Sequence, residues 1–221
     1  MKIPIMPTSL LDPRFQKSAP IDHPIHELLR QRWSPRALSA EPISSADLHT
    51  LFEALRWTPS ASNEQPWSFL VATREDPEIF DELLACLNPG NQVWARNAYL
   101  LMVTVARRDL IAKPQPNRTS HYDLGQAVAC LTLQATALGL AVHQMAGIDL
   151  DKSRKAGQVS DGFDPVTAVA IGYPAESSTL PEEVRKKDAV ARVRKPLREF
   201  VFGARWEQPA QWLNAPTSRA G

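Results

Sequence analysis

The sequence predicts one sheet covered by helices, with a long buried helix among them. Apolar runs of strand length are interspersed with segments of helical periodicity, without a regular strand–helix–strand order. The longest helical pattern, residues 122–140, carries small and apolar residues nearly all round, as a buried central helix would. The chain has 221 residues, 43% hydrophobic and 22% charged, which suits one fairly large domain with its own core.

Local signals place the helices. A short helix begins near Ile25 and ends before Pro35, because the residue ahead of a proline avoids the helical conformation. Ser44 to Asp47 caps a second helix, which ends at Trp57-Thr58-Pro59. Asn88-Pro89-Gly90 is expected to break a third, and Gly139 to end the central one. The helices expected beyond the second cover residues 76–87, 122–140 and 149–158.

Four apolar, β-rich runs are expected to form the strands. Residues 99–106 are nearly all apolar, so this strand should be central and covered on both faces. A polar loop is expected at residues 113–120 and a charged connection at 175–191. We expect an extended arm at 1–24, the main domain at 25–206 and a polar tail at 207–221. The other strands are expected at 67–73, 141–145 and 166–173.

Composition narrows the possible functions. The net charge of +1 leaves no electrostatic footprint for nucleic acid or an anionic membrane, and no apolar run is long enough to span a bilayer. Cys86 and Cys130 are expected to be reduced thiols in a cytoplasmic protein. The five histidines show no metal-ligand spacing, and His143 is expected to be structural. With no catalytic side-chain set in view, we expect the chemistry to belong to a bound cofactor.

Residues Arg32-Trp33-Ser34-Pro35-Arg36 form the first cluster that could bind a ligand. Two guanidinium groups flank a hydroxyl in a turn that proline restricts, and this combination suits a phosphate. Taken alone, two solvated arginines are the simpler interpretation. The third cluster, Arg192-Val193-Arg194-Lys195-Pro196-Leu197, is similar, and a solvated charge run is its simpler interpretation.

The second cluster is the loop from Pro59 to Trp67, whose sequence is PSASNEQPW. It places short polar side chains between two prolines, so little conformational entropy is left to lose on binding. A plain polar connection is the simpler interpretation, although binding sites often lie on such ordered loops.

In this order and spacing, the clusters resemble the nitroreductase family of flavoproteins over residues 25–206. Asp123-x-Gly125-x-Ala127, with the long helix after it, is similar to the central helix of the family. Gln144-Met145-Ala146-Gly147-Ile148 is similar to its segment near flavin N5. The resemblance implies an α+β fold, a mixed central sheet surrounded by helices and an intertwined homodimer with FMN at the interface.

The resemblance also implies roles for individual residues. Arg32 and Ser34, with Arg192 and Arg194, would hold the FMN phosphate. Arg36 would lie near N1 and O2 of the flavin, where negative charge grows on reduction. The remaining implied contacts are Trp33 in the first cluster, Pro59, Ser60, Ser62 and Asn63 at the flavin of the other subunit, Asn91 at the isoalloxazine edge, and Met145, Ala146 and Gly147 near N5. Ala61 and Gln65 of the same loop are also expected to bind the cofactor.

The implied reaction is ping-pong transfer of a hydride from NADH or NADPH, through flavin N5, to a small acceptor such as a nitroaromatic or a quinone. No protein acid or base is needed for it. Two alternatives stay open: the same fold with a dehalogenase, azoline dehydrogenase or flavin-processing reaction, or a non-enzymatic flavin-binding protein. The first would require a lid, for which the loop Asp109–Ser120 is the candidate.

Two positions depart from the family pattern. Cys130 occupies a position in the central helix where the family often has Asn, and a packing change is expected there. Trp94 stands where some members have a lysine near flavin O2. This leaves Arg36 as the main cation expected at that edge. Trp94 is expected to pack in the protein, with stacking on the acceptor as the alternative.

Overall fold

The computed structural model describes residues 12–113 and 115–214. The chain separates into two compact units that divide between Val190 and Ala191, and each is described by itself. The predicted arm, domain and tail (1–24, 25–206 and 207–221) differ from this division and remain predictions. Residues 1–11 of the arm and 215–221 of the tail lie outside the described residues.

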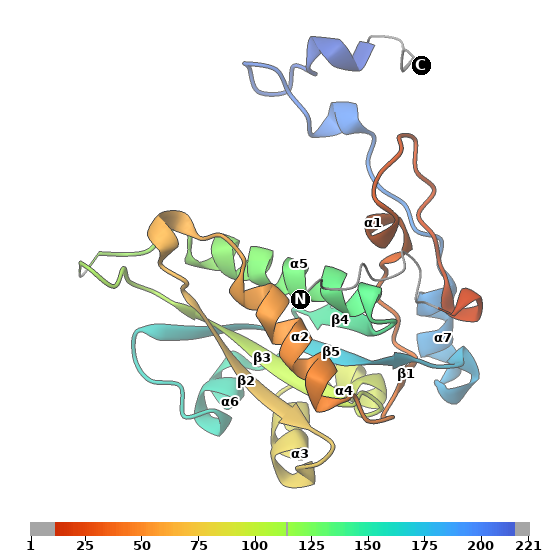
Figure 1. Cartoon of the computed structure of the whole chain (residues 1–221), viewed down its shortest axis with the longest axis vertical. Helices are drawn as coiled ribbons and strands as arrows, with labels where there is room; N and C mark the ends of the chain where they lie inside the picture. Colours follow the sequence, from red (N-terminus) through yellow and green to blue (C-terminus); the bar gives the residue numbers. More distant parts are fainter. Residues whose placement is uncertain (1–11, 114, 215–221) are drawn as a thin grey trace, which may run out of the picture. The chain divides into compact units, whose positions relative to one another are not determined.

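The sheet of the first unit is built around its last strand, β5 (Figure 1). β5 pairs with β3 on one edge, and with β4 and then β1 on the other. Every bonded pair of the described strands is antiparallel, so β3 and β4 run in the same direction on either side of β5. The strands are β1 (Leu38–Ser39), β2 (Trp67–Thr73), β3 (Leu100–Arg107), β4 (Ala141–Met145) and β5 (Phe163–Pro174).

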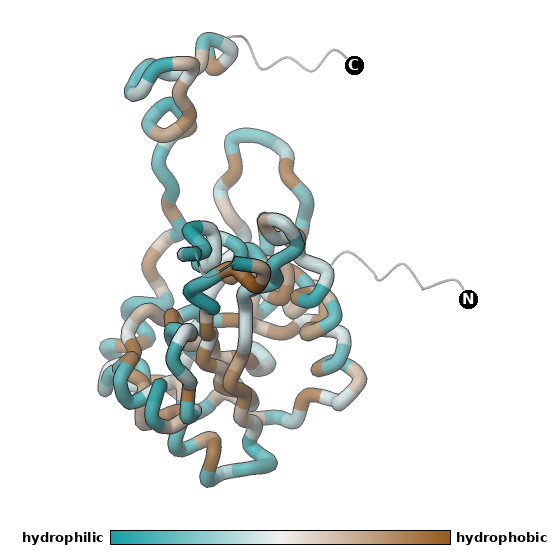
Figure 2. Tube along the Cα trace, turned by 90° about the vertical axis from the view of Figure 1, so that its left-hand side faces the viewer, coloured by the Kyte–Doolittle hydropathy of each residue, from teal (hydrophilic) through white to brown (hydrophobic). Residues whose placement is uncertain are grey.

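Helices cover both faces of this sheet, which confirms the predicted α+β fold. Alternation along β3 sends Leu101 and Val103 to one core and Leu100 and Met102 to the other, all 2% exposed or less. The first core includes residues of α3 and α4, and the second those of α2 and α5. Figure 2 shows hydrophobic stretches within the body that holds the sheet. The predicted central position of β3 is confirmed.

The helices of the first unit differ from the prediction chiefly in number. They are α1 (Glu27–Gln31), α2 (Ser45–Arg56), α3 (Pro77–Ala85), α4 (Pro89–Ala95), α5 (Ser120–Ala137), α6 (Leu150–Ala156) and α7 (Glu182–Ala189), with 3-10 turns η1 (Pro13–Phe15), η2 (Ala61–Asn63) and η3 (Ser177–Thr179).

Two helices occupy segments that were predicted to be irregular. Asn88-Pro89-Gly90 does end α3, but Pro89 is also the first residue of α4 with Asn88 at its N-cap position. Proline suits this place because the first helical N–H has no helical partner to lose. α7 lies in the predicted charged connection, and Val184 and Asp188 are buried, one turn apart on the helix. The first correction follows from helix-end chemistry, and the second from the buried side of a mostly charged helix.

Gly139 ends α5 as predicted. Its φ is +74°, a conformation that costs other residues energy. Its N–H donates to the carbonyl of Thr136, and the N–H of Leu140 donates to that of Ala135. These two bonds satisfy carbonyl groups that the end of the helix leaves open.

Replacement of Gly139 by Ala is therefore expected to lower the free energy of unfolding by about 1–2 kcal/mol. Urea denaturation would measure it. Gly90→Ala is the matched control, because an added Cβ there meets nothing within 4 Å and φ is ordinary. Equal losses in the two variants would contradict this account of the turn.

α5 is less buried than predicted. Leu124, Val128 and Leu131 face the core at 3% exposure or less. Tyr122 is 70% exposed, and Gly125 and Ala129 on the same side of the helix are exposed too. An added Cβ at Gly125 would meet nothing within 4 Å. The small and apolar residues all round α5 therefore leave one side without a partner in the protomer.

The second unit, residues 191–214 as described, holds the 3-10 turns η4 (Leu197–Glu199) and η5 (Gln211–Asn214). The rings of Phe202 and Trp206 meet edge to face at 5.1 Å, yet Trp206 is 80% exposed.

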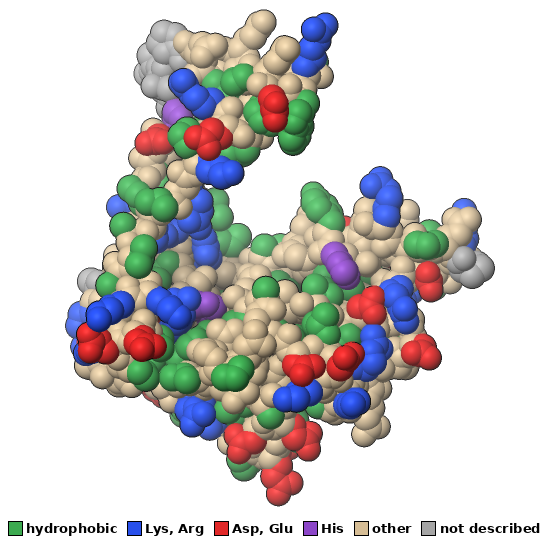
Figure 3. Space-filling view, turned by 180° about the vertical axis from the view of Figure 1, so that it is seen from behind, with side chains coloured by type: hydrophobic (Ala, Val, Ile, Leu, Met, Phe, Trp, Pro, Cys, Tyr) green, Lys and Arg blue, Asp and Glu red, His purple; other side chains and the backbone are tan. Residues whose placement is uncertain are grey.

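Figure 3 shows cationic and anionic side chains interspersed on the face of the molecule that it presents. Among the described residues, no helix has the length and apolarity needed to cross a bilayer.

Candidate functional site

The segment 32–36 connects α1 to β1 and lies against β4. The carbonyl of Pro35 accepts a hydrogen bond from Nδ1 of His143 at 3.0 Å. Because a carbonyl can only accept, Nδ1 carries the ring hydrogen. Burial lowers the pKa of His143 below 6.5, so the ring is neutral at neutral pH. These contacts agree with the prediction of a structural histidine.

Arg36 is fixed by Asp188, near the end of α7. Its Nη1 lies 2.8 Å from Oδ1 of Asp188, and its backbone N–H donates to Oδ2 at 2.7 Å. Within the described residues, Nε and Nη2 of Arg36 donate to nothing. Beside it, Nε1 of Trp33 donates to the carbonyl of Phe15 at 3.0 Å. The segment is thus held from several sides, with guanidinium donors to spare.

The end of β4 offers backbone donors. Met145 is 3% exposed and anchors the strand, and the chain then leaves the sheet. In the described part of the chain, the N–H groups of Ala146 and Gly147 donate to no other residue. Two unengaged N–H groups beside an anchored strand end fit a ligand atom that accepts hydrogen bonds.

Asn91 on α4 is joined to this strand end. Its Nδ2 donates to the carbonyl of Gly147 at 3.0 Å, and the N–H of Asn88 donates to the same carbonyl at 3.0 Å. The structure therefore brings Asn91 to Gly147 at the end of β4, and the predicted contacts of these residues with flavin remain predictions. Asn91 is placed there by α4, the helix that sequence reasoning missed.

The loop from Pro59 to Gln65 has an unusual backbone. Ser62, Asn63 and Gln65 have φ values of 53°, 55° and 45°, which non-glycine residues rarely adopt. Oγ of Ser60 accepts from the N–H of Gln65 at 2.9 Å and closes the loop. Such strain persists where surrounding contacts enforce it, and it clusters at functional sites.

Two buried carboxylates fasten this loop. Asp123, at the start of α5 and 2% exposed, accepts from the N–H of Ala61 at 3.2 Å. Oε2 of Glu64 accepts from Nη2 of Arg107 at 2.9 Å and from the N–H of Ile111 at 2.8 Å. The second contact ties the loop 59–65 to the predicted lid loop at 109–120. No feature of these residues identifies that loop as a lid.

The predicted site residues thus fall into two groups at opposite ends of α5. Ala61 contacts Asp123 in its first turn. Arg32 lines a small cavity together with Thr136 in its last turn. Asp123 and Thr136 are separated by about 20 Å along the axis, at about 1.5 Å per residue. One protomer therefore does not bring the loop 59–65 to the segment 32–36.

The predicted packing of Trp94 has a clear outcome. Trp94 is 1% exposed and packs 4.5 Å from the ring of His143, so its packing role is confirmed and stacking on an acceptor is wrong. Arg192 and Arg194 belong to the second unit, and their roles remain predictions. Among the described residues, no group of His, Cys, Asp or Glu could hold a metal ion.

Comparisons with known proteins identify the family of this chain. A sequence profile of the nitroreductase family matches residues 29–173. The chain belongs to the nitroreductase family. A solved structure described as an oxidoreductase containing FMN is 34% identical, with a TM-score of 0.80, and the match covers 85% of this chain and 96% of that one. The predicted family of oxidoreductases is therefore confirmed.

Two curated relatives of this nitroreductase-family chain match a smaller share of it. An uncharacterised 15.4 kDa protein of Mycolicibacterium smegmatis is 33% identical over 135 residues, which is 60% of this chain and 87% of the relative. A Polynucleobacter asymbioticus protein is 28% identical over 167 residues, 65% of this chain and 82% of the relative. It carries the provisional name NADH dehydrogenase/NAD(P)H nitroreductase.

Sequence reasoning missed Asp188, Asp123 and Glu64 as residues that hold the site. For Asp188, the available signal was helical: glutamates in the first turn and lysines in the last match the dipole of α7. Asp123 was quoted in the central-helix motif, but nothing showed that its carboxylate reaches Ala61. Glu64 stood within the recognised loop without an apparent partner.

Proposed function

We propose that this protein is an FMN-dependent oxidoreductase that takes a hydride from NADH or NADPH and reduces a small acceptor such as a nitroaromatic or a quinone. Membership of the nitroreductase family supports the class of reaction. The similar structure that contains FMN supports the cofactor, and the name of the Polynucleobacter relative supports the nicotinamide donor. When bound, FMN supplies the hydride-accepting chemistry.

The residues present fit FMN on chemical grounds. Arg32 and Ser34 would hold the phosphate, because guanidinium and hydroxyl donors suit its oxygens. Arg36 would face the pyrimidine edge with its unengaged donors. The free N–H groups of Ala146 and Gly147 would face N5, and Asn91 would hold the adjacent edge.

The single observation that supports a shared site is the separation along α5. The loop 59–65 and the segment 32–36 lie at opposite ends of this helix, so a second copy in the reverse orientation would bring one beside the other. The exposed side of α5, with Tyr122, Gly125 and Ala129, suits such a contact. We therefore propose a homodimer in which each flavin is bound by both chains.

The protein's own contribution would be positioning and exclusion of water. The loop 59–65 is held in a strained form that leaves little to reorganise on binding. No acid or base side chain is assigned, because hydride transfer needs none. The acceptor binds in the place that the nicotinamide leaves, which is the ping-pong order predicted from the sequence.

Absorption spectroscopy of the purified protein tests the proposal. The protein should take up FMN, turn yellow and bleach when NADH or NADPH is added without oxygen; added nitroaromatic or quinone should restore the colour. A protein that takes up no FMN contradicts the proposal. Bound flavin that the nicotinamides cannot reduce supports another flavin reaction on this fold. Flavin that is reduced but never turns over supports a flavin carrier.

Replacement of Gly147 by Ala is expected to weaken FMN binding about tenfold, the loss of one hydrogen bond. The new Cβ would lie 2.7 Å from Nδ2 of Asn91, so this amide must move, which disturbs its bond to the carbonyl of Gly147. Flavin fluorescence titration measures the affinity. Gly90→Ala, in α4 next to Asn91 but with open space around the added Cβ, is the control and should leave the affinity unchanged.

A further inference from the structure

Asp188 lies where a negative charge is unfavourable, and its carboxylate is bound to Arg36. Its side chain is 6% exposed, and it lies in the last turn of α7, where the helix dipole disfavours negative charge. Both its oxygens bind Arg36, one through the backbone N–H at 2.7 Å and one through Nη1 at 2.8 Å. The carboxylate therefore fixes both the main chain and the guanidinium of one residue.

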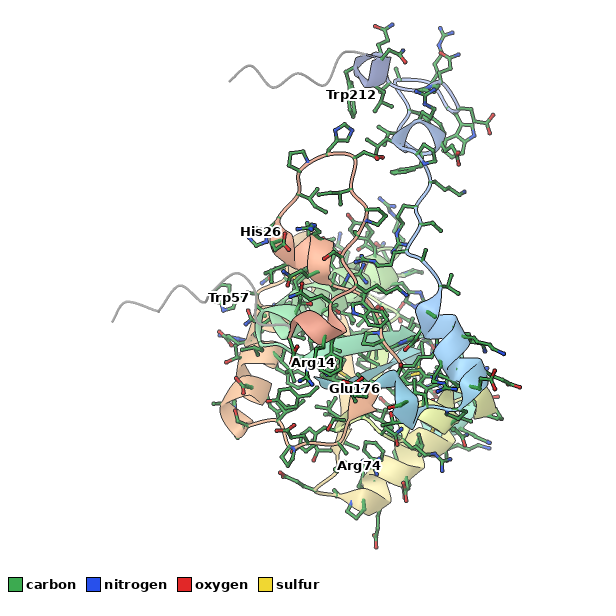
Figure 4. The ribbon with its side chains drawn as sticks, turned by 90° about the vertical axis from the view of Figure 1, so that its right-hand side faces the viewer. Arg14, His26, Trp57, Arg74, Glu176 and Trp212 are labelled. Carbon is green, nitrogen blue, oxygen red and sulfur yellow. The ribbon has the colours of Figure 1, made fainter. Side chains whose placement is uncertain are left out.

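The end of α7 is itself fastened to the chain. Nζ of Lys17 donates to the carbonyl of Asp188, and to that of Val190 at 2.6 Å. Nη1 of Arg14 lies 3.9 Å from Oε1 of Glu176, and Figure 4 shows these two side chains beside each other. Asp188 consequently has little freedom to move away from Arg36.

Stability alone does not explain this ion pair. A buried pair loses in desolvation much of what it gains in attraction, and apolar residues of similar volume often serve as well. Arg36, the other member of the pair, carries the positive charge that is proposed to face the flavin. A carboxylate against that guanidinium offsets part of its positive charge while holding it in place.

We propose that Asp188 is a positioning residue that holds Arg36 beside the flavin and, by offsetting its charge, lowers the reduction potential of bound FMN. This inference rests on the proposed function. Reduction adds negative charge near N1 and O2, and an unpartnered Arg36 would favour the reduced form more strongly. Asp188 weakens that preference, so electrons leave the reduced flavin for the acceptor more readily.

The test is the reduction potential of FMN bound to the Asp188→Asn variant. Asparagine can still accept one hydrogen bond from Arg36 but carries no charge. Reduced FMN should bind about tenfold more tightly relative to oxidised FMN than in the unmodified protein. For a two-electron couple this ratio raises the potential by about 30 mV. Anaerobic titration with a reference dye measures it.

Two further variants make the result specific. Asp188→Glu keeps the charge and should stay near the unmodified potential. Glu183→Gln removes an exposed carboxylate from the same helix and should not shift it, because Glu183 lies outside the pair. Far-ultraviolet circular dichroism and oxidised-FMN affinity show whether each variant folds and loads.

Other outcomes contradict the inference. An unchanged potential in Asp188→Asn shows that the carboxylate does not act on the flavin. A lowered potential shows that it serves only to anchor Arg36, since the cation has then been lost from the edge. Failure of the unmodified protein to bind FMN contradicts the proposed function instead, so the two failures are distinct. If Asp188→Asn does not fold, a shift in Asp188→Glu as large as 30 mV also contradicts the inference.

Discussion

Two variants that each lack flavin are expected to regain it when they are produced together. Arg32→Glu repels the phosphate, and Asn63→Glu places a carboxylate in the loop proposed to reach the other chain's flavin. Each variant alone should lose its FMN during purification, because one charge-assisted contact is replaced by repulsion. In a mixed dimer, the intact loop of one chain meets the intact segment of the other. The expected flavin content is about a quarter of that of the unmodified protein, since about half of randomly paired dimers are mixed.

Differently tagged chains sharpen this experiment. Purification through both tags isolates the mixed dimer, which should hold one FMN where the unmodified dimer holds two. As a control, each variant is produced alone with the two tags on separate copies. The dimer purified through both tags should then stay colourless. If one chain built the whole site, the mixed dimer would also be colourless, because each chain would carry a damaged site of its own.

Loss of Glu64 is expected to have the largest effect on stability. Oε2 of Glu64 accepts from Arg107 and from the N–H of Ile111, and the Glu64 and Arg107 side chains are 10% and 19% exposed. Glu64→Ala leaves a largely buried guanidinium without its carboxylate. The free energy of unfolding should fall by about 3 kcal/mol, the lower part of the range for breaking a buried pair. Urea denaturation measures it.

The matched control for this pair is Arg108→Ala. Arg108 lies 3.7 Å from Asp164, and the two side chains are 50% and 37% exposed. Such a pair contributes little, so the loss should stay below about 1 kcal/mol. A loss in Glu64→Ala no larger than in Arg108→Ala would show that the buried pair is not important for stability.

Much of the fold was predictable because its signals are local. β2 and β4 have the predicted bounds, residues 67–73 and 141–145, since alternation and flanking breakers define them. α2 begins at its predicted cap, with Ser44 accepting from the N–H of Asp47. α7 was missed because it is mostly charged and only one side of it is buried.

The candidate site was predictable in its residues and only partly in its arrangement. Clusters of arginine, serine and amides are visible in the sequence, whereas their partners are distant in the chain. Asp188 lies 152 residues from Arg36, and Asp123 lies 62 from Ala61. No periodicity links such pairs. The fold alone shows that two groups of site residues lie at opposite ends of α5. The sequence resemblance had assigned these two groups to different chains.

The place of β5 in the sheet determines when a newly made chain can finish folding. β5 is last among the strands in the sequence, yet it lies between β3 and β4. Until the chain as far as Pro174 has left the ribosome, β5 is missing from its place between these two strands. Their backbone groups on that side are then unpaired. A nascent or truncated chain is therefore open to pairing with its neighbours, and crowded polysomes are where aggregation would begin. When β5 arrives, it pairs with β3 and with β4 at the same time.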